Sequence, residues 1–165
     1  MIELLILDVD GTMTNGKITY TNSGEELKSF CVKDGLAIAT WKKMGRKVAI
    51  ITGRESKIVE NRAKELKVDY LVQNCKDKLS KADEILKQEN IDWSRVAVVG
   101  DDLNDYNMLK ASKLSFVPKD GSYILDNVAI RLSSMGGNGA IREAIEYILK
   151  SEGKLEEFIN IWLLN

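Results

Sequence analysis

The sequence predicts an α/β fold: a Rossmann-like parallel sheet with helices on both faces, a small β-hairpin flap and no cap domain. Short apolar runs alternate with helical patterns along the chain, as in proteins whose parallel strands are joined by helices. Three of these runs end in clusters of polar residues, which is typical of the ligand-binding edge of such a sheet. A chain of 165 residues is about the size of one domain, so we expect a single domain over residues 1–165.

The first two expected elements are a buried strand and a hairpin. The strand is expected at residues 2–7, where the run IELLIL is followed by the turn-prone pair Asp10-Gly11. Residues 17–20 and 26–31 alternate apolar and polar side chains on either side of a Thr-Asn-Ser-Gly turn. This pattern predicts a hairpin flap over about 16–31.

Helices and strands alternate along the rest of the chain. Helices are expected where apolar residues recur every three or four positions, over 35–44, 56–66, 78–88, 104–111 and 139–150. Strands are expected at the short apolar runs 47–51, 69–72, 96–99, 114–117 and 128–131. The C-terminal segment 154–165 is strongly apolar and contains Phe158 and Trp162. We expect this tail to pack on its own domain or on a neighbouring subunit, because exposing it to water is unfavourable.

The chain contains no histidine, which excludes a Ser-His-Asp triad, a Cys-His pair and any histidine-ligated metal site. Its 24 basic and 25 acidic residues nearly balance, so no basic excess indicates a nucleic-acid partner. No apolar run approaches the length of a membrane span, and the acidic N-terminus does not resemble a signal peptide. We therefore expect a cytoplasmic protein, without a membrane partner, in which Cys31 and Cys75 are reduced thiols.

Polar residues directly follow several predicted strands. They are Asp8 and Asp10 after the first strand, Thr52 and Gly53 after the strand at 47–51, and Asp101 after the strand at 96–99. Because the carboxyl ends of parallel strands lie at one edge of a sheet, we expect these residues to converge on one crevice. Lys78 begins a predicted helix and can reach the same crevice from the side.

The chemistry that this set of residues can perform is narrow. Crowded carboxylates repel one another, and a hard divalent cation such as Mg²⁺, with its preference for oxygen ligands, relieves that repulsion. A hydroxyl, backbone N–H groups near glycines and a lysine ammonium suit the oxygens of a phosphoryl group. One aspartate can attack phosphorus and form an aspartyl-phosphate, while a second aspartate serves as acid and base. The set predicts Mg²⁺-dependent phosphoryl transfer that needs no histidine.

Asp8-x-Asp10, Thr52, Lys78 and Asp101 follow one another in the order of the four motifs of the haloacid dehalogenase superfamily of phosphatases. The chain resembles this superfamily over essentially its whole length. The segments DVDGTMTNG, GEELKxFxVKDG, TGR, KDKL, GDDLND and GGNGAIRE are more narrowly similar to the 3-deoxy-D-manno-octulosonate 8-phosphate phosphatases. The resemblance implies that Asp8 is the nucleophile and Asp10 the general acid and base. It implies that Mg²⁺ is bound by Asp8, by Asp101 and by the backbone carbonyl of Asp10. It also implies that Thr52, Gly53 and Lys78 bind the phosphoryl group, and that Thr52 and Lys78 are catalytic.

The substrate implied by the resemblance is 3-deoxy-D-manno-octulosonate 8-phosphate, an intermediate of lipopolysaccharide precursor synthesis. Its carboxylate requires a cation, and the candidate residues are Lys33, Arg54 and Arg62. Residue 12 is Thr, where the resembled phosphatases more often have Val. The final segment EEFINIWLLN is more similar to that of nonulosonate 9-phosphate phosphatases, so a nine-carbon substrate is an alternative.

The chain leaves no room for a separate lid over the crevice. Besides the strand at 47–51, the residues between Thr12 and Thr52 hold one hairpin and one helix, and residues 53–77 hold one helix and one strand. An open crevice exposes the reacting groups to bulk water, which is unfavourable for phosphoryl transfer. We therefore expect another part of the molecule to cover it. The hairpin and the apolar tail are the candidates, and the resemblance implies a homotetramer in which neighbouring subunits complete each site.

Two other classes of protein share parts of this pattern. A signalling receiver domain is disfavoured, because its phosphorylated aspartate ends the third strand and the strand after Thr52 ends in Val72-Gln73-Asn74. A non-catalytic, oligomerising domain of the same fold is the second alternative. The presence of the four motif residues Asp8, Asp10, Lys78 and Asp101 favours an enzyme over such a domain.

Overall fold

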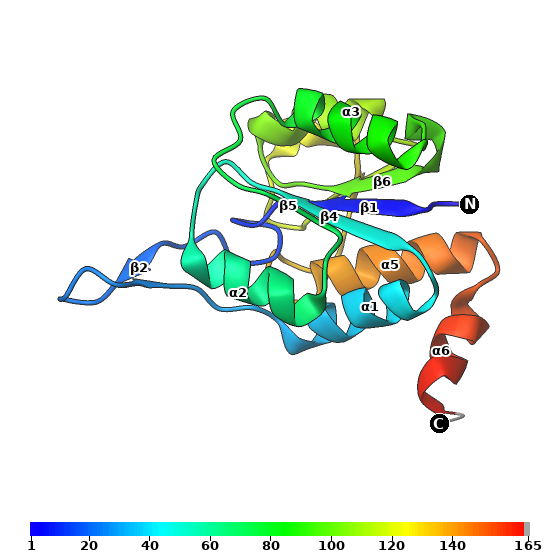
Figure 1. Ribbon diagram of the computed structural model, residues 1–165, viewed down its shortest axis with the longest axis horizontal. Coiled ribbons are helices and arrows are strands. Elements are labelled where there is room, and N and C mark those ends of the chain that lie inside the picture. Colours follow the sequence, from blue (N-terminus) through cyan, green and yellow to red (C-terminus); the bar gives the residue numbers. More distant parts are fainter. Residues whose placement is uncertain (164–165) are drawn as a thin grey trace.

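The computed structural model describes residues 1–163, and within them a six-stranded parallel sheet forms the centre of the molecule (Figure 1). The strand order is β5-β4-β1-β6-β7-β8. The strands are β1 (Leu4–Leu7), β4 (Lys47–Ile51), β5 (Tyr70–Val72), β6 (Val96–Val99), β7 (Leu114–Val117) and β8 (Ile130–Arg131). A separate antiparallel hairpin consists of β2 (Thr19–Tyr20) and β3 (Glu26–Leu27). The predicted fold class is confirmed.

Helices cover both faces of the sheet (Figure 1). One face packs against α1 (Val32–Lys43), α2 (Lys57–Leu66) and α5 (Ala140–Ser151), and the other against α3 (Lys78–Glu89) and α4 (Tyr106–Ala111). Short 3-10 turns lie at Trp93–Arg95, Leu103–Asp105 and Tyr123–Asn127. In β1, Leu5 and Leu7 face the first layer while Leu4 and Ile6 face the second. Burial on both faces explains why the central strands are continuous apolar runs in the sequence.

The hairpin is shorter than the sequence pattern predicts. The expected strand over 26–31 is wrong beyond Leu27, and α1 begins at Val32 instead of residue 35. The chain leaves the hairpin because the Lys28 side chain turns in to pair with Asp10 and Phe30 packs against the core. The expected strand over 128–131 begins only at Ile130, because Val128 ends the preceding 3-10 turn.

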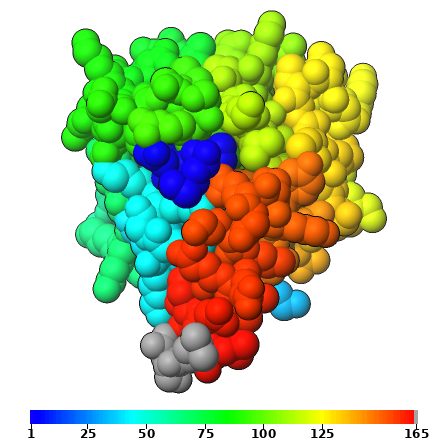
Figure 2. All heavy atoms as spheres, turned by 90° about the vertical axis from the view of Figure 1, so that its right-hand side faces the viewer, coloured from blue at the N-terminus to red at the C-terminus, as the bar shows by residue number. Residues whose placement is uncertain are grey.

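The C-terminal tail forms helix α6 (Leu155–Leu163), which packs on its own chain. Phe158 is buried in the core, and the indole Nε1 of Trp162 donates a hydrogen bond of 2.7 Å to Oγ1 of Thr40 in α1. Figure 1 places α6 at the end of the molecule opposite the hairpin, and Figure 2 shows that end, with α6 beside α1. The last two residues of the predicted tail, 164–165, lie outside the described residues.

The docking of α6 predicts a difference between two neighbouring apolar residues. Phe158→Ala should lower the free energy of unfolding by roughly 3 kcal/mol, because it leaves a cavity where a buried ring had packed. Ile159→Ala is the matched control and should change it by less than about 0.5 kcal/mol, since Ile159 is exposed. Urea unfolding followed by circular dichroism measures both. Equal effects of the two substitutions would contradict the docking of α6 through Phe158.

Candidate active site

The carboxyl ends of β1, β4 and β6 surround a cleft of about 330 Å³. Its lining residues are Asp8, Asp10, Thr52, Gly53, Arg54, Asp101, Asp102, Leu103 and Asn104. Lys78, the first residue of α3, donates a hydrogen bond to Asp8. The structure therefore brings together the residues that the sequence placed at the ends of three strands, together with Lys78 and Arg54.

The loop after β1 holds Asp8 in place through its backbone. The Asp8 N–H donates to the carbonyl of Val99 in β6 at 3.1 Å, which fixes the residue directly beyond the sheet. The next turn requires Gly11, whose φ of +96° is unfavourable for other residues. A Cβ at this position would also lie 2.0 Å from Oδ2 of Asp101. The DxDG pattern thus lets the β1 loop approach the carboxylate after β6.

Lys78 is a buried cation that contacts Asp8. Its Nζ donates to Oδ1 of Asp8 at 2.6 Å and to Oδ1 of Asp105 at 2.7 Å, and its side chain is 1% exposed. Burial opposes the charged form of Lys78, but the carboxylates of Asp8 and Asp105 outweigh burial and raise the pKa of the ammonium. Lys78 therefore stays charged and keeps one oxygen of Asp8 oriented.

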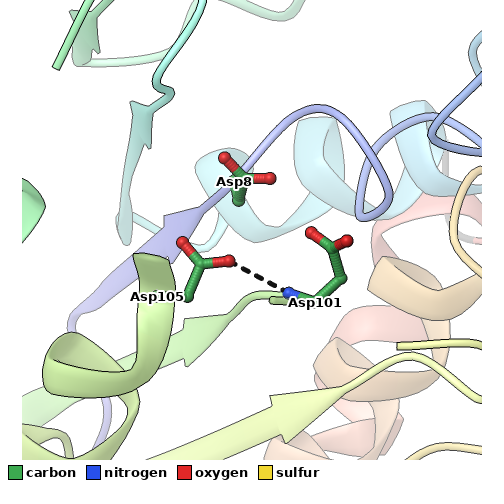
Figure 3. A group of neighbouring side chains, drawn as sticks. All are labelled: Asp8, Asp101 and Asp105. Atoms are coloured by element: carbon green, nitrogen blue, oxygen red, sulfur yellow. Dashed lines mark hydrogen bonds between the residues drawn. The ribbon is translucent and has the colours of Figure 1, made fainter. Parts of the chain in front are cut away.

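Asp105 is a site residue that the sequence reasoning missed. It is fully buried, and its Oδ2 accepts a hydrogen bond of 3.0 Å from the backbone N–H of Asp101 (Figure 3). Asp105 thus holds both Lys78 and the loop that carries Asp101. The available signal was the GDDLND segment, in which Asp105 is the last residue.

The carboxylates of Asp8, Asp101 and Asp105 form a compact cluster (Figure 3). One carboxylate oxygen from each lies within 4.8 Å of the others. Burial, and next the repulsion between the carboxylates, raises the pKa of both Asp8 and Asp101. This crowding, with oxygen as the ligand atom, fits a hard divalent cation such as Mg²⁺.

Thr52 and Gly53 form the wall of the cleft that follows β4. The Thr52 N–H donates to the carbonyl of Val72 at 2.9 Å, and its own carbonyl accepts from the Cys75 N–H at 3.1 Å. Both bonds extend the pairing of β4 with the segment that leads to Lys78. The backbone therefore fixes where the threonine side chain and the following glycine meet the cleft.

Two residues of the hairpin segment contact residues that line the cleft. Lys28 pairs with Asp10, and Glu26 accepts a hydrogen bond of 2.8 Å from Nη2 of Arg54. Sequence reasoning missed Lys28 and Glu26, although both belong to the GEELK segment. These side chains reach Asp10 and Arg54 only because the chain folds back after β3, which local patterns do not reveal.

Lys33 and Arg62 are not among the residues that line the cleft. Lys33 is exposed in the first turn of α1. The guanidinium of Arg62 lies over the Phe30 ring, 5.5 Å from its centroid, and pairs with Glu65 at 2.8 Å. Arg62 therefore packs between α1 and α2, and the carboxylate-binding role of these two residues stays a prediction.

The VKDG segment (residues 32–35) and the GGNG segment (residues 136–139) hold the loop after β1 in place. The buried Asp34 carboxylate accepts hydrogen bonds from the N–H groups of Gly139 and Arg142, so it caps α5 across space. A Cβ on Gly136 would lie 1.8 Å from the Gly11 carbonyl oxygen, so only glycine fits against the loop after β1. These two segments hold the loop that carries Asp8 and Asp10 against α5.

Comparisons with known proteins assign the chain to a family. The family model of the haloacid dehalogenase-like hydrolases matches residues 29–113. The 3-deoxy-D-manno-octulosonate 8-phosphate phosphatase KdsC of Escherichia coli K12 is 41% identical over 157 residues, covering 94% of this chain and 84% of that protein.

Solved structures are similar over nearly the whole chain. The 3-deoxy-D-manno-octulosonate 8-phosphate phosphatase of Moraxella catarrhalis, in complex with a magnesium ion, a phosphate ion and KDO, is 37% identical with a TM-score of 0.93, covering 98% of this chain and 93% of that one. The cobalt-bound phosphatase of Haemophilus influenzae is 34% identical with a TM-score of 0.88, covering 93% and 91%. The resemblance inferred from the motifs is confirmed. The chain belongs to the haloacid dehalogenase-like hydrolases and, among them, to the family of the 3-deoxy-D-manno-octulosonate 8-phosphate phosphatases.

Proposed function

We propose that this protein hydrolyses 3-deoxy-D-manno-octulosonate 8-phosphate to the free sugar acid and phosphate, with Mg²⁺ as cofactor. The observation that carries the proposal is the meeting of Asp8, Asp101 and the buried Lys78 at one edge of the sheet, with Asp10 in the same cleft. A carboxylate nucleophile, a metal-binding cluster and a buried cation are the groups that phosphoryl transfer requires. The 41% identity to KdsC supports the choice of substrate.

The reaction proceeds in two steps that regenerate the enzyme. A carboxylate oxygen of Asp8 attacks phosphorus, the bond from phosphorus to the sugar oxygen breaks, and Asp10 gives its proton to that oxygen. Asp10 then takes a proton from water as the water oxygen attacks phosphorus, and the bond between Asp8 and phosphorus breaks. Thr52, the Gly53 backbone and Lys78 hold the phosphoryl oxygens during both steps.

Asp8, the backbone carbonyl of Asp10 and Asp101 would hold Mg²⁺, which offsets the negative charge of the carboxylates and of the phosphate when bound. Asp105 holds Lys78 and the Asp101 backbone in place, so its role is to position these groups.

The sugar carboxylate is assigned to cations at the rim of the cleft. Arg54 lines the cleft, and its side chain is 43% exposed, so it can reach an acidic group of the substrate. Lys33 and Arg62 stay secondary candidates for this role. The C-terminal segment EEFINIWLLN supports a nonulosonate 9-phosphate as the alternative substrate.

We further propose a cytoplasmic homotetramer in which subunits complete one another's sites. The hairpin projects from the molecule with Ile18, Tyr20 and Leu27 exposed, which is unfavourable unless another surface covers them (Figure 1). Helix α6 lies at the end remote from the hairpin, so α6 can cover only the cleft of a neighbouring subunit. Within residues 1–163, no helix combines the length and the apolar character needed to span a membrane.

The nucleophile is tested by Asp8→Asn, which is nearly isosteric. The change should abolish phosphate release, a loss of more than roughly 10⁴-fold in kcat, because an amide does not attack phosphorus. Asp83→Asn is the matched control, since Asp83 is an exposed α3 residue whose acceptor to Trp93 is retained by asparagine. Phosphate release and thermal unfolding are measured for both. Wild-type turnover by Asp8→Asn would rule out the mechanism.

The metal is tested by removal and return. Phosphatase activity should vanish after treatment with EDTA and recover with Mg²⁺, because Asp8, Asp101 and a phosphate group do not crowd together without a cation. Activity is measured at each step of a Mg²⁺ titration of the chelated protein. Full activity after exhaustive chelation would contradict the assignment.

Substrate and assembly are tested together. The value of kcat/KM should be highest for 3-deoxy-D-manno-octulosonate 8-phosphate, lower for a nonulosonate 9-phosphate and lowest for glucose 6-phosphate, because only the first two carry a carboxylate. Light scattering should give the mass of a tetramer. A fully active monomer would refute the shared sites, and a preference for glucose 6-phosphate would refute the substrate.

A further inference from the structure

Lys28 is a buried cation on an otherwise exposed hairpin. Its side chain is 1% exposed, whereas the preceding residue, Leu27, is 52% exposed. The ammonium donates to Oδ1 of Asp10 and lies 3.5 Å from Oε1 of Glu26. Burying an ammonium is costly unless carboxylates compensate it, so these two partners hold the side chain in one place.

The two oxygens of Asp10 face two different cations. Lys28 contacts Oδ1, while Nε of Arg54 lies 3.8 Å from Oδ2, beyond hydrogen-bond distance. Arg54 is also hydrogen-bonded to Glu26 at 2.8 Å, so Glu26 links the two cations. Because Arg54 is 43% exposed, its hold on Asp10 is weak and solvent-screened, and Lys28 is the fixed partner.

We propose that Lys28 is the positioning residue for Asp10: by holding Oδ1 it fixes the plane of the carboxylate and leaves Oδ2 to exchange protons with the sugar oxygen and with water. This inference rests on the proposed function, in which Asp10 is the acid and base. An aspartate side chain rotates about two bonds, and proton transfer requires one oxygen at hydrogen-bond distance from the reacting atom. A buried donor on the other oxygen removes that freedom.

The alternative role for Lys28 is to anchor the hairpin. An anchor would affect substrate binding, subunit assembly or thermal stability, whereas a residue that positions Asp10 would affect kcat. The two roles also differ in their dependence on Asp10, because only the positioning role disappears when Asp10 no longer transfers protons.

The experiment compares Lys28→Met with Lys57→Met. Lys57 forms an exposed ion pair with Glu60 and does not line the cleft, so the control removes the same charge from the same kind of partner outside the site. In Lys28→Met, kcat for 3-deoxy-D-manno-octulosonate 8-phosphate should fall by roughly 10- to 100-fold, with KM and the tetramer nearly unchanged. Lys57→Met should match the wild type.

Lys28→Met and Lys57→Met are then each combined with Asp10→Asn. Asp10→Asn alone should lower kcat by about 10²- to 10⁴-fold. Lys28→Met should cause little further loss in that background. An unchanged kcat in Lys28→Met, or a further loss in Asp10→Asn as large as in the wild type, would overturn the inference. If Lys28→Met does not fold, Lys28→Ala is subjected to the same criteria. A wild-type protein that is inactive with Mg²⁺ would refute the proposed function instead.

Discussion

The ammonium of Lys78 lies between the carboxylates of Asp8 and Asp105, and the rest of the site is arranged around this buried contact. Three carboxylates at one edge of the sheet repel one another, and the ammonium of Lys78 offsets part of this repulsion. Removing one partner of such a buried group leaves an uncompensated charge, which is far more costly than losing a surface ion pair. The helix that carries Lys78 and the two loops that carry the aspartates therefore depend on one another.

Close backbone approach makes this arrangement possible. The loop after β1 lies between the loop after β6 and the glycine-rich segment before α5, and Gly11 and Gly136 provide the space on its two sides. Asp34 reinforces the contact by capping α5 from α1. Three segments far apart in the sequence thus fix one short loop, and catalytic carboxylates need such a rigid support.

The surface of the molecule exposes apolar side chains that no part of the same chain covers within the described residues. The hairpin exposes apolar side chains near the cleft, while α6 contributes Phe158 to the core and leaves Ile159 and Trp162 partly exposed at the other end. An open cleft leaves the charged groups of the site in contact with bulk water, which weakens the electrostatic interactions between them. The exposed apolar side chains at both ends of the molecule support the proposal that assembly completes the sites.

The sequence by itself determined the parallel sheet, the helices on its faces and the convergence of Asp8, Thr52 and Asp101. It could do so because short continuous apolar runs mark the central strands, and parallel strands bring their carboxyl ends to one edge. The tertiary structure alone decided that Lys28 turns inward to Asp10, that Asp105 pairs with Lys78, and that Arg62 packs over Phe30 away from the cleft. It also decided that α6 docks through Phe158 on its own chain. The direction of a long charged side chain depends on which oppositely charged or aromatic groups the fold brings next to it. Those groups come from segments that no local sequence pattern connects.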